Sequence, residues 1–207
     1  IDTSPDLRQQ LLAEKITSID NILYTHFHAD QTHGINDLRV FYLKKKKKID
    51  IYSDKLTAKY LSKNFSYCFV KSYDYPAILN FKSLKKNFMI GNVDKKIDIK
   101  AIKVKHGLID SIAYIINSKI AYVSDANEFY RKDYVYFKNL KYLIIDCLWF
   151  DYHPSHLNLE KSLFYIDKFK PENAILTNLS HVLDYKKLKK SLPINVMPAY
   201  DGLTVKL

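Results

Sequence analysis

The stretch YTHFHADQTHG, residues 24–34, holds three of the seven histidines in this chain of 207 residues, together with an aspartate. It follows the apolar run NILYT, which is typical of a buried strand, so His26 and His28 are expected where that strand ends. Side chains two positions apart in an extended segment point the same way, which lets His26, His28 and Asp30 approach one ion. Imidazole and carboxylate ligands are typical of zinc, manganese or iron sites. We favour a metal site over three surface histidines in a polar loop.

Hydrophobic periodicity predicts helices and strands along the chain. We expect helices over residues 5–15, capped by Ser4, and over 54–63, 159–169 and 183–192. We expect strands over residues 19–25, 49–53, 96–106, 141–149, 173–178 and close to 202–207, and a hairpin over 111–125 that turns at 117–119. Residues 65–92 have no clean period and are expected to form an irregular excursion that could act as a lid. The pattern predicts a single α/β domain, residues 1–207, with mixed β-sheets.

The net charge limits which partners are expected, and the cysteine content indicates the redox state of the compartment. A net charge of +11 favours an anionic partner, although solvated surface lysines explain it equally simply. The run Lys44–Lys48 is expected to be an exposed helix end or turn. Cys68 and Cys147 lie in apolar contexts typical of buried thiols, which predicts a reducing, cytoplasmic location. No run approaches the ~18 apolar residues that a bilayer crossing needs, so we expect no membrane partner.

Four ordered segments carry a family resemblance. THFHADQTHG resembles the T-H-x-H-x-D-H signature of the metallo-β-lactamase superfamily, and His106 in KVKHGLIDSIAY resembles its third histidine. Asp125 in AYVSDANEF resembles the carboxylate that bridges two metals, and His181 in LTNLSHVLDY resembles the last histidine. The resemblance implies an αββα sandwich with two mixed β-sheets and metals at one edge, with the first N-terminal strands missing from this chain. The closest branch is that of the phosphoribosyl cyclic phosphodiesterases, which are akin to transfer-RNA-processing endonucleases.

Two positions depart from the family pattern at the same metal. Gln31 and Asn178 stand where the resemblance implies histidines, and an amide oxygen is a weak neutral ligand. His33 and His181 lie close enough in sequence to substitute. The resemblance therefore implies one firmly bound Zn²⁺ or Mn²⁺ and a weaker second ion; the first site would comprise His26, His28, His106 and Asp125. The second would comprise Asp30, Asp125 and His181, with Gln31, His33 or Asn178 as possible substitute ligands.

Each downstream ligand also has a simpler explanation. His106 could end a strand as a satisfied polar residue, Asp125 could cap a turn or helix, and His181 could be a surface residue at a helix start. Their joint occurrence, in the family's order, favours the metal site.

Hydrolysis of a phosphodiester needs an activated water and a proton for the leaving oxygen. Bound zinc lowers the pKa of its water to about 7, which makes hydroxide available at neutral pH. His156 in HPSHLNLEKS resembles a histidine of the phosphodiesterase branch that is not a ligand, so we expect it to be the general acid, with His153 as the alternative. Asp30 is the third residue expected to be catalytic. Arg39, and also Arg8, could bind the substrate phosphate, with Asp37 and Asp6 as candidate orienting carboxylates.

These residues predict a metal-dependent hydrolase of a small phosphodiester, with a cyclic ribose phosphate as one possibility. A nuclease acting on RNA or DNA is the first alternative. The sequence shows no separate basic and aromatic motif for gripping a long strand, but Lys44–Lys48 with Tyr42 leave this alternative open. A metal-binding member that lost hydrolysis through Gln31 and Asn178 is the second. A homodimer is possible.

Overall fold

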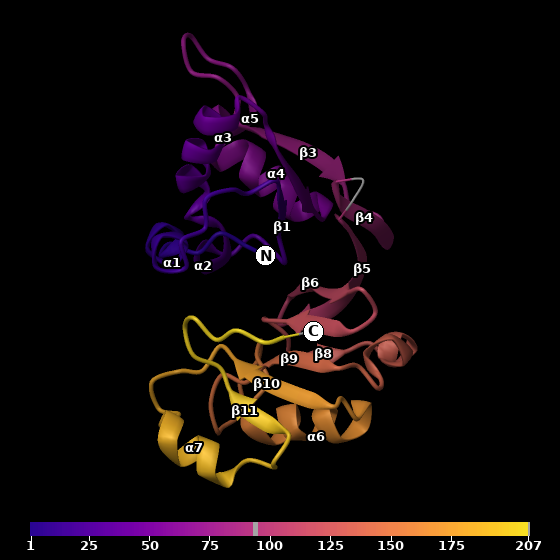
Figure 1. The fold of residues 1–207 in the computed structure, drawn as a ribbon. Helices are drawn as coiled ribbons and strands as arrows, with labels where there is room; N and C mark the ends of the chain where they lie inside the picture. The colour runs from indigo at the N-terminus through magenta and orange to yellow at the C-terminus, as the bar shows by residue number, and fades with distance from the viewer. Residues whose placement is uncertain (93–94, 207) are drawn as a thin grey trace. The chain divides into compact units, whose positions relative to one another are not determined.

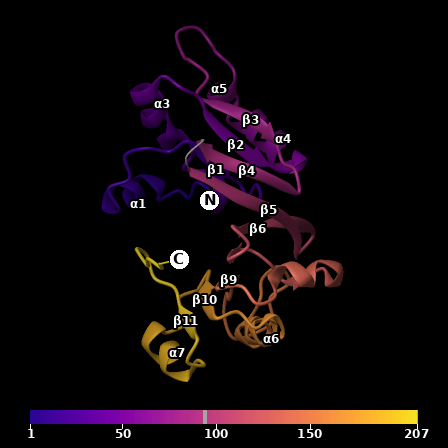
Figure 2. The same cartoon turned by 45° about the vertical axis from the view of Figure 1, so that its right-hand side comes forward.

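The computed structural model describes residues 1–92 and 95–206. The chain forms two compact units, each of which is described by itself. The first comprises Ile1–Lys85 and Ile90–Lys95, and the second comprises Lys86–Met89 and Lys96–Leu207. In Figures 1 and 2 the first unit runs from indigo to magenta and the second from salmon to yellow.

The first unit is built on a parallel three-stranded sheet in the order β1-β2-β3. Its strands are β1 (Asn21–Leu23), β2 (Ile49–Ser53) and β3 (Leu79–Ser83). Alternate residues of β2 are buried, as its two-residue period predicts. The helices are α1 (Leu7–Ala13), α2 (Ala29–Thr32), η1 (Ile35–Leu38), α3 (Arg39–Lys45), α4 (Lys55–Asn64) and α5 (Ser66–Phe69).

The loop that carries the histidines of the first unit packs against the start of the chain. Backbone hydrogen bonds join Thr3 N to Gln31 O (2.8 Å) and Gly34 N to Thr3 O (2.9 Å). Gly34 permits this approach, because a Cβ at that position would lie 2.0 Å from the carbonyl oxygen of Ser4. Beneath the loop, Tyr24, Ile35 and Leu38 are fully buried in the core of this unit. The loop is thereby fixed on a packed base.

The second unit holds most of an eight-stranded mixed sheet in the order β11-β10-β9-β7-β6-β5-β4, with β8 paired to β5. The strands of this sheet are β4 (Asn87–Asn92), β5 (Lys95–His106), β6 (Ile109–Ile116), β7 (Ile120–Val123), β8 (Glu128–Phe129), β9 (Tyr142–Asp146), β10 (Asn173–Thr177) and β11 (Val196–Pro198). Strands β5, β6 and β7 pair antiparallel, and β7, β9, β10 and β11 pair in parallel. The helices are η2 (Arg131–Phe137), α6 (Leu159–Phe169) and α7 (Tyr185–Ser191).

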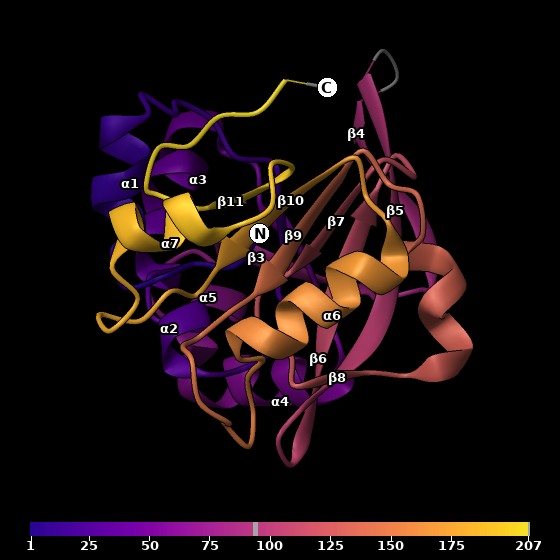
Figure 3. The ribbon, with the colours of Figure 1, turned by 90° about the horizontal axis from the view of Figure 1, so that it is seen from below.

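Helix α6 lies across the strands of this sheet in Figure 3. Its residues Tyr165, Ile166 and Phe169 join the core cluster that contains Leu143 and Ile145 of β9. The Asn158 side chain caps the helix by accepting a hydrogen bond from Lys161 N (3.0 Å). This cap fixes where the loop before α6 ends, and that loop carries His153 and His156.

The predicted α/β fold class is confirmed, and several elements match their predicted positions. Strand β2 and helix α6 have the predicted bounds, and β6 and β7 form the predicted hairpin. The hairpin turns where Asn117 and Ser118 have φ values of 49° and 52°, the left-handed conformation of a tight two-residue turn. Lys44–Lys48 are exposed around the end of α3, as predicted.

Three predictions about elements are wrong. Residues 65–92 contain α5, β3 and β4 instead of an irregular excursion, because β3 pairs along its whole length with β2. Residues 203–206 form no strand, and Leu207 lies outside the described residues; the last strand is β11. Ser4 does not cap α1, since its hydroxyl donates to Gln10 Oε1 (3.0 Å).

Cys68 and Cys147 are buried free thiols, as predicted. Within residues 1–92 and 95–206, no helix combines the length and apolar character that a bilayer crossing requires.

Candidate metal centre

Three metal-type side chains converge in the second unit. His106, Asp125 and His156 each offer a ligand atom, and these atoms lie within 4.8 Å of one another. His106 ends β5, Asp125 follows β7, and His156 precedes α6, so neighbouring sheet elements bring them together. His106 and Asp125 are each 2% exposed, and His156 is partly buried. Sequence analysis predicted all three as site residues.

A backbone carbonyl selects the tautomer of the neutral His106 ring. Its Nδ1 lies 2.7 Å from the carbonyl oxygen of Ser155, which can only accept, so Nδ1 carries the proton and donates. Nε2 is then the ring's acceptor atom, as in a histidine that binds metal. Gly107 adopts a left-handed φ of 61° next to Ser155, and its amide donates to Asn127 Oδ1 (3.1 Å). These contacts hold the loop that orients His106.

A buried carboxylate holds His156. Its Nδ1 lies 2.7 Å from Asp146 Oδ2, which also accepts the Ala126 amide (2.9 Å). The His156 Nε2 lies 3.9 Å from Asp125 Oδ1. Asp146 is fully buried, and this burial raises the pKa of its carboxyl from 3.8 to about 7, although its hydrogen bond to His156 opposes the rise. Asp146 therefore orients the ring that faces Asp125.

Two further predicted residues of this unit, Asn178 and His153, contact members of the cluster. Asn178 is partly buried, and its Nδ2 donates weakly to Asp125 Oδ2 (3.4 Å). The His153 ring lies 5.1 Å from the His156 ring, and burial lowers the pKa of His153. His181 is exposed in the turn before α7, and the described metal-type groups do not include it.

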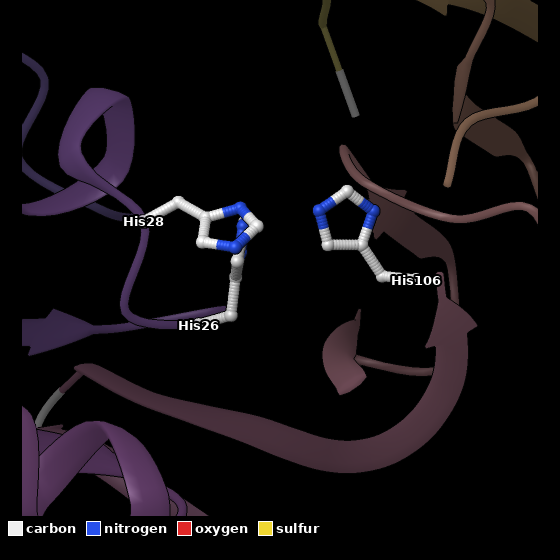
Figure 4. A group of neighbouring side chains, drawn as sticks. All are labelled: His26, His28 and His106. Atoms are coloured by element: carbon white, nitrogen blue, oxygen red, sulfur yellow. The ribbon is translucent and has the colours of Figure 1, made fainter. Parts of the chain in front are cut away.

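In the first unit, His26 and His28 lie side by side. Figure 4 shows both rings, with His28 at the start of α2, and their ring centroids are 4.4 Å apart. The Thr25 hydroxyl donates to Asp2 Oδ2 (2.9 Å), so the Nδ1 of His26 must donate to Thr25 Oγ1 (3.0 Å). As in His106, the acceptor atom of His26 is then Nε2. His106 itself is drawn at the end of β5 in the same figure.

The other predicted residues of the first unit are more exposed. Asp30 is exposed in α2 and accepts a hydrogen bond from Gln31 Nε2 (2.9 Å). The exposed His33 has its Nδ1 3.2 Å from Thr32 Oγ1, and its ring lies edge-on to Phe65. The described metal-type groups include neither Asp30 nor His33.

The candidate phosphate-binding residues lie along α1, η1 and α3. Arg8, Asp37 and Arg39 line one groove of about 580 Å³ in the first unit. The Arg39 guanidinium stacks over the Tyr75 ring, 3.6 Å from its centroid. Asp6 is exposed at the start of α1 and is not among the residues lining the groove.

Sequence analysis missed the carboxylates that orient the histidines. Asp146 could have been suspected, because it ends the apolar strand YLIID with a charge that a buried position needs to satisfy. Asp2 gave no usable signal, since its role depends on a partner 23 positions away. Ser155 acts through its backbone, which no side-chain motif reveals.

The chain is similar to known proteins over most of its length. Residues 1–178 match the model of a family described as the beta-lactamase superfamily domain. An octanoyltransferase from Porphyromonas gingivalis is 27% identical over 206 residues, which cover 98% of this chain. The chain spans only 41% of the length of that curated relative.

Two solved structures share the fold. One is a new diphosphatase from the PhnP family, with 28% identity, a TM-score of 0.87 and coverage of 98% of this chain and 76% of the other. The other is the metallo-beta-lactamase fold protein YhfI from Bacillus subtilis, with 18% identity and a TM-score of 0.75. That match covers 98% of this chain and 84% of YhfI.

Proposed function

Because the chain belongs to the metallo-β-lactamase superfamily, a superfamily of hydrolases, we propose that it cleaves a small phosphodiester, with a cyclic ribose phosphate as a fitting substrate. The observation that carries the proposal is the convergence of His106, Asp125 and His156. The PhnP-family diphosphatase supports a substrate that contains phosphate. We also propose that the two units form one domain, residues 1–207, since the family match extends through both units.

We assign a firmly bound Zn²⁺ or Mn²⁺ to His26, His28, His106 and Asp125, following the family's ligand order. The donor chemistry fits, because hydrogen bonds hold the proton of both His26 and His106 on Nδ1. When bound, such an ion would supply a water of lowered pKa and polarise a phosphoryl oxygen. A weaker second ion is assigned to Asp30, Asp125 and His181, with Gln31, His33 and Asn178 as substitute ligands.

His156 is proposed to donate a proton to the leaving oxygen. Asp146 would position it, because the carboxylate accepts from Nδ1 and leaves Nε2 as the atom that faces the cluster. His153 remains the alternative acid, since its ring lies beside that of His156. Arg39 is the proposed phosphate ligand, with its guanidinium held against Tyr75.

We propose a reducing, cytoplasmic setting, because the two cysteines are buried free thiols.

The test combines metal content with hydrolysis of bis-p-nitrophenyl phosphate in added zinc or manganese. His28→Ala and His106→Ala change one unit each, and both should lose the ion and the activity, because the proposed ion needs ligands from both. His156→Ala should keep the ion and lose turnover by about 100-fold or more. Tyr73→Ala, which changes an exposed side chain, is the matched control and should alter neither.

Each contrary outcome points to a different error. An unchanged ion content in His28→Ala would refute the shared ion, and metal loss in His156→Ala would make that residue a ligand. Full metal loading without hydrolysis of the ester or of a nucleoside diphosphate would favour a member that binds metal without hydrolysis. Cleavage of an RNA oligonucleotide faster than of the small ester would favour the nuclease.

A further inference from the structure

The second unit carries a basic groove with exposed aromatic side chains. The groove has a volume of about 780 Å³ and lies between η2, α6 and the loop before α6. Its lining includes the cations Arg131, Lys161 and Lys168 and the rings of Tyr134, Tyr152 and Phe164. Figure 3 shows α6 across the sheet of this unit. The proposed hydrolysis uses none of these side chains.

The cations of the groove are not neutralised by the protein. Within the described residues, Arg131, Lys161 and Lys168 form no ion pair with a carboxylate. Glu128, an acidic residue of the lining, is paired with Lys105 (2.8 Å). The groove therefore favours a ligand that carries several negative charges.

The aromatic rings alternate with the cations. Tyr152 is 69% exposed and Phe164 is 55% exposed, although burial of such rings would be favourable. The Lys161 Nζ lies 5.3 Å from the Tyr152 ring centroid. The Lys168 Nζ lies 5.1 Å from the Tyr134 ring centroid and 5.3 Å from the Phe164 ring centroid. Exposed rings such as those of Tyr152 and Phe164 can stack flat, uncharged groups while the neighbouring cations hold charged ones.

We propose that this groove binds single-stranded nucleic acid, with bases stacked on Tyr152 and Phe164 and phosphates held by Arg131, Lys161 and Lys168. An acidic peptide would satisfy the cations but has no flat groups for the rings, so a polynucleotide fits better. From residue 161 to 168 the helix rises roughly 10 Å, at 1.5 Å per residue. This length accommodates about three stacked nucleotides at roughly 3.4 Å each.

Two lining residues of the groove lie close, in sequence or by hydrogen bond, to residues next to the histidines of the same unit. Asn127 lines the groove and binds the amide of Gly107, which directly follows His106. Tyr152 lines it too and directly precedes His153. The groove lining therefore contacts the loop that follows His106 through Asn127. Binding of single-stranded nucleic acid is a property beyond the proposed hydrolysis of a small ester. It can be measured in the absence of any hydrolysis.

Fluorescence anisotropy tests the inference with labelled hexanucleotides of uridine and of thymidine, in chelator so that no hydrolysis occurs. Phe164→Ala and Tyr152→Ala should each weaken binding by about 5-fold or more. Lys161→Ala and Lys168→Ala should each reduce the slope of log affinity against log salt by about 0.7. The matched controls are Tyr73→Ala, an exposed ring of the first unit, and Lys189→Ala in α7, and both should bind normally.

Two results would overturn the inference. In the first, inorganic polyphosphate of the same charge binds as tightly as the oligonucleotides, and Phe164→Ala does not change the affinity for either. The groove would then bind anions by charge alone, without base stacking. Alternatively, all four groove variants could bind like the wild type, and the nucleic acid would then lie elsewhere. Circular dichroism establishes that each variant is folded, and failure of ester hydrolysis leaves this test unaffected.

Discussion

Asp146 has two effects that the substitution Asp146→Asn separates. Burying its charge lowers the stability of the fold, and its hydrogen bond positions His156 for turnover. The carboxyl is fully buried, and its Oδ1 accepts no hydrogen bond within the described residues. Burial raises its pKa from 3.8 to about 7. At about 1.4 kcal/mol per pKa unit, keeping the carboxylate ionised well above pH 7 costs the fold on the order of 4 kcal/mol. Asparagine has nearly the same shape and does not titrate.

The sign of the pH dependence follows from the raised folded pKa. The protonated carboxyl contributes its full stability below the unfolded pKa of about 4, and this contribution is lost as pH rises through about 7. In protein stripped of metal, Asp146→Asn should therefore exceed the wild type in unfolding free energy at about pH 8, by roughly 1–4 kcal/mol. The excess should shrink toward pH 4. Urea unfolding at several pH values measures the difference.

The Asp146→Asn variant should be more stable at about pH 8 but should turn over more slowly than the wild type. The variant exchanges a charge-assisted hydrogen bond of 2.7 Å for a neutral one, a loss of about 1–1.5 kcal/mol. If that bond positions His156 in the rate-limiting step, kcat should fall about 5- to 10-fold while the ion stays bound. Asp151→Asn, an exposed carboxylate of the same loop, is the matched control and should change neither quantity. A variant that is less stable at every pH, or that turns over normally, would refute this reasoning.

Two further predictions concern packing. Gly34→Ala should lower stability by about 1–3 kcal/mol, measured by urea unfolding, because the added Cβ would lie 2.0 Å from the carbonyl oxygen of Ser4, and backbone must move to admit it. An unchanged midpoint would contradict that contact. Burial raises the pKa of the Cys68 thiol to about 11 and that of Cys147 to about 12, so both should resist a disulfide reagent at about pH 8. Both should react once urea unfolds the chain; fast reaction of the native protein would mean that the thiols are accessible.

Elements with local signals were predictable from sequence. Strand β2 alternates buried and partly exposed residues, and α6 begins at the asparagine cap of an amphipathic run. Strand β3 escaped prediction because its signal is not local: it is held by pairing with β2, as where Ile49 faces Leu79 across 30 positions. Propensity over a short window does not contain that partner.

The functional residues also fall into those with a local sequence signal and those without one. Its histidines stand out because few residue types bind metals, and residues 24–34 concentrate them. The groove between η2 and α6 did not stand out, since its cations and rings come from three separated segments. The first segment supplies Arg131 and Tyr134, the loop before α6 supplies Tyr152, and α6 supplies two lysines and two aromatic residues, so each segment alone has a common surface composition. Only the packing of η2 and α6 on one sheet makes them a single surface.

The two amides that stand where the family resemblance implies histidines each donate to a carboxylate. In the first unit the Gln31 amide donates to Asp30 Oδ2, and in the second the Asn178 amide donates to Asp125 Oδ2. Asn178 has a φ of 61°, a conformation that asparagine adopts readily. Under the proposed ligand assignment, each amide would compete with the second ion for an oxygen of Asp30 or Asp125, whereas a histidine at either position would add a ligand atom. Asp125 is also assigned to the first ion, but these two hydrogen bonds involve carboxylates and not the proposed ligands His26, His28 and His106 of that ion. We therefore expect the two departures to weaken binding of the second ion more than that of the first.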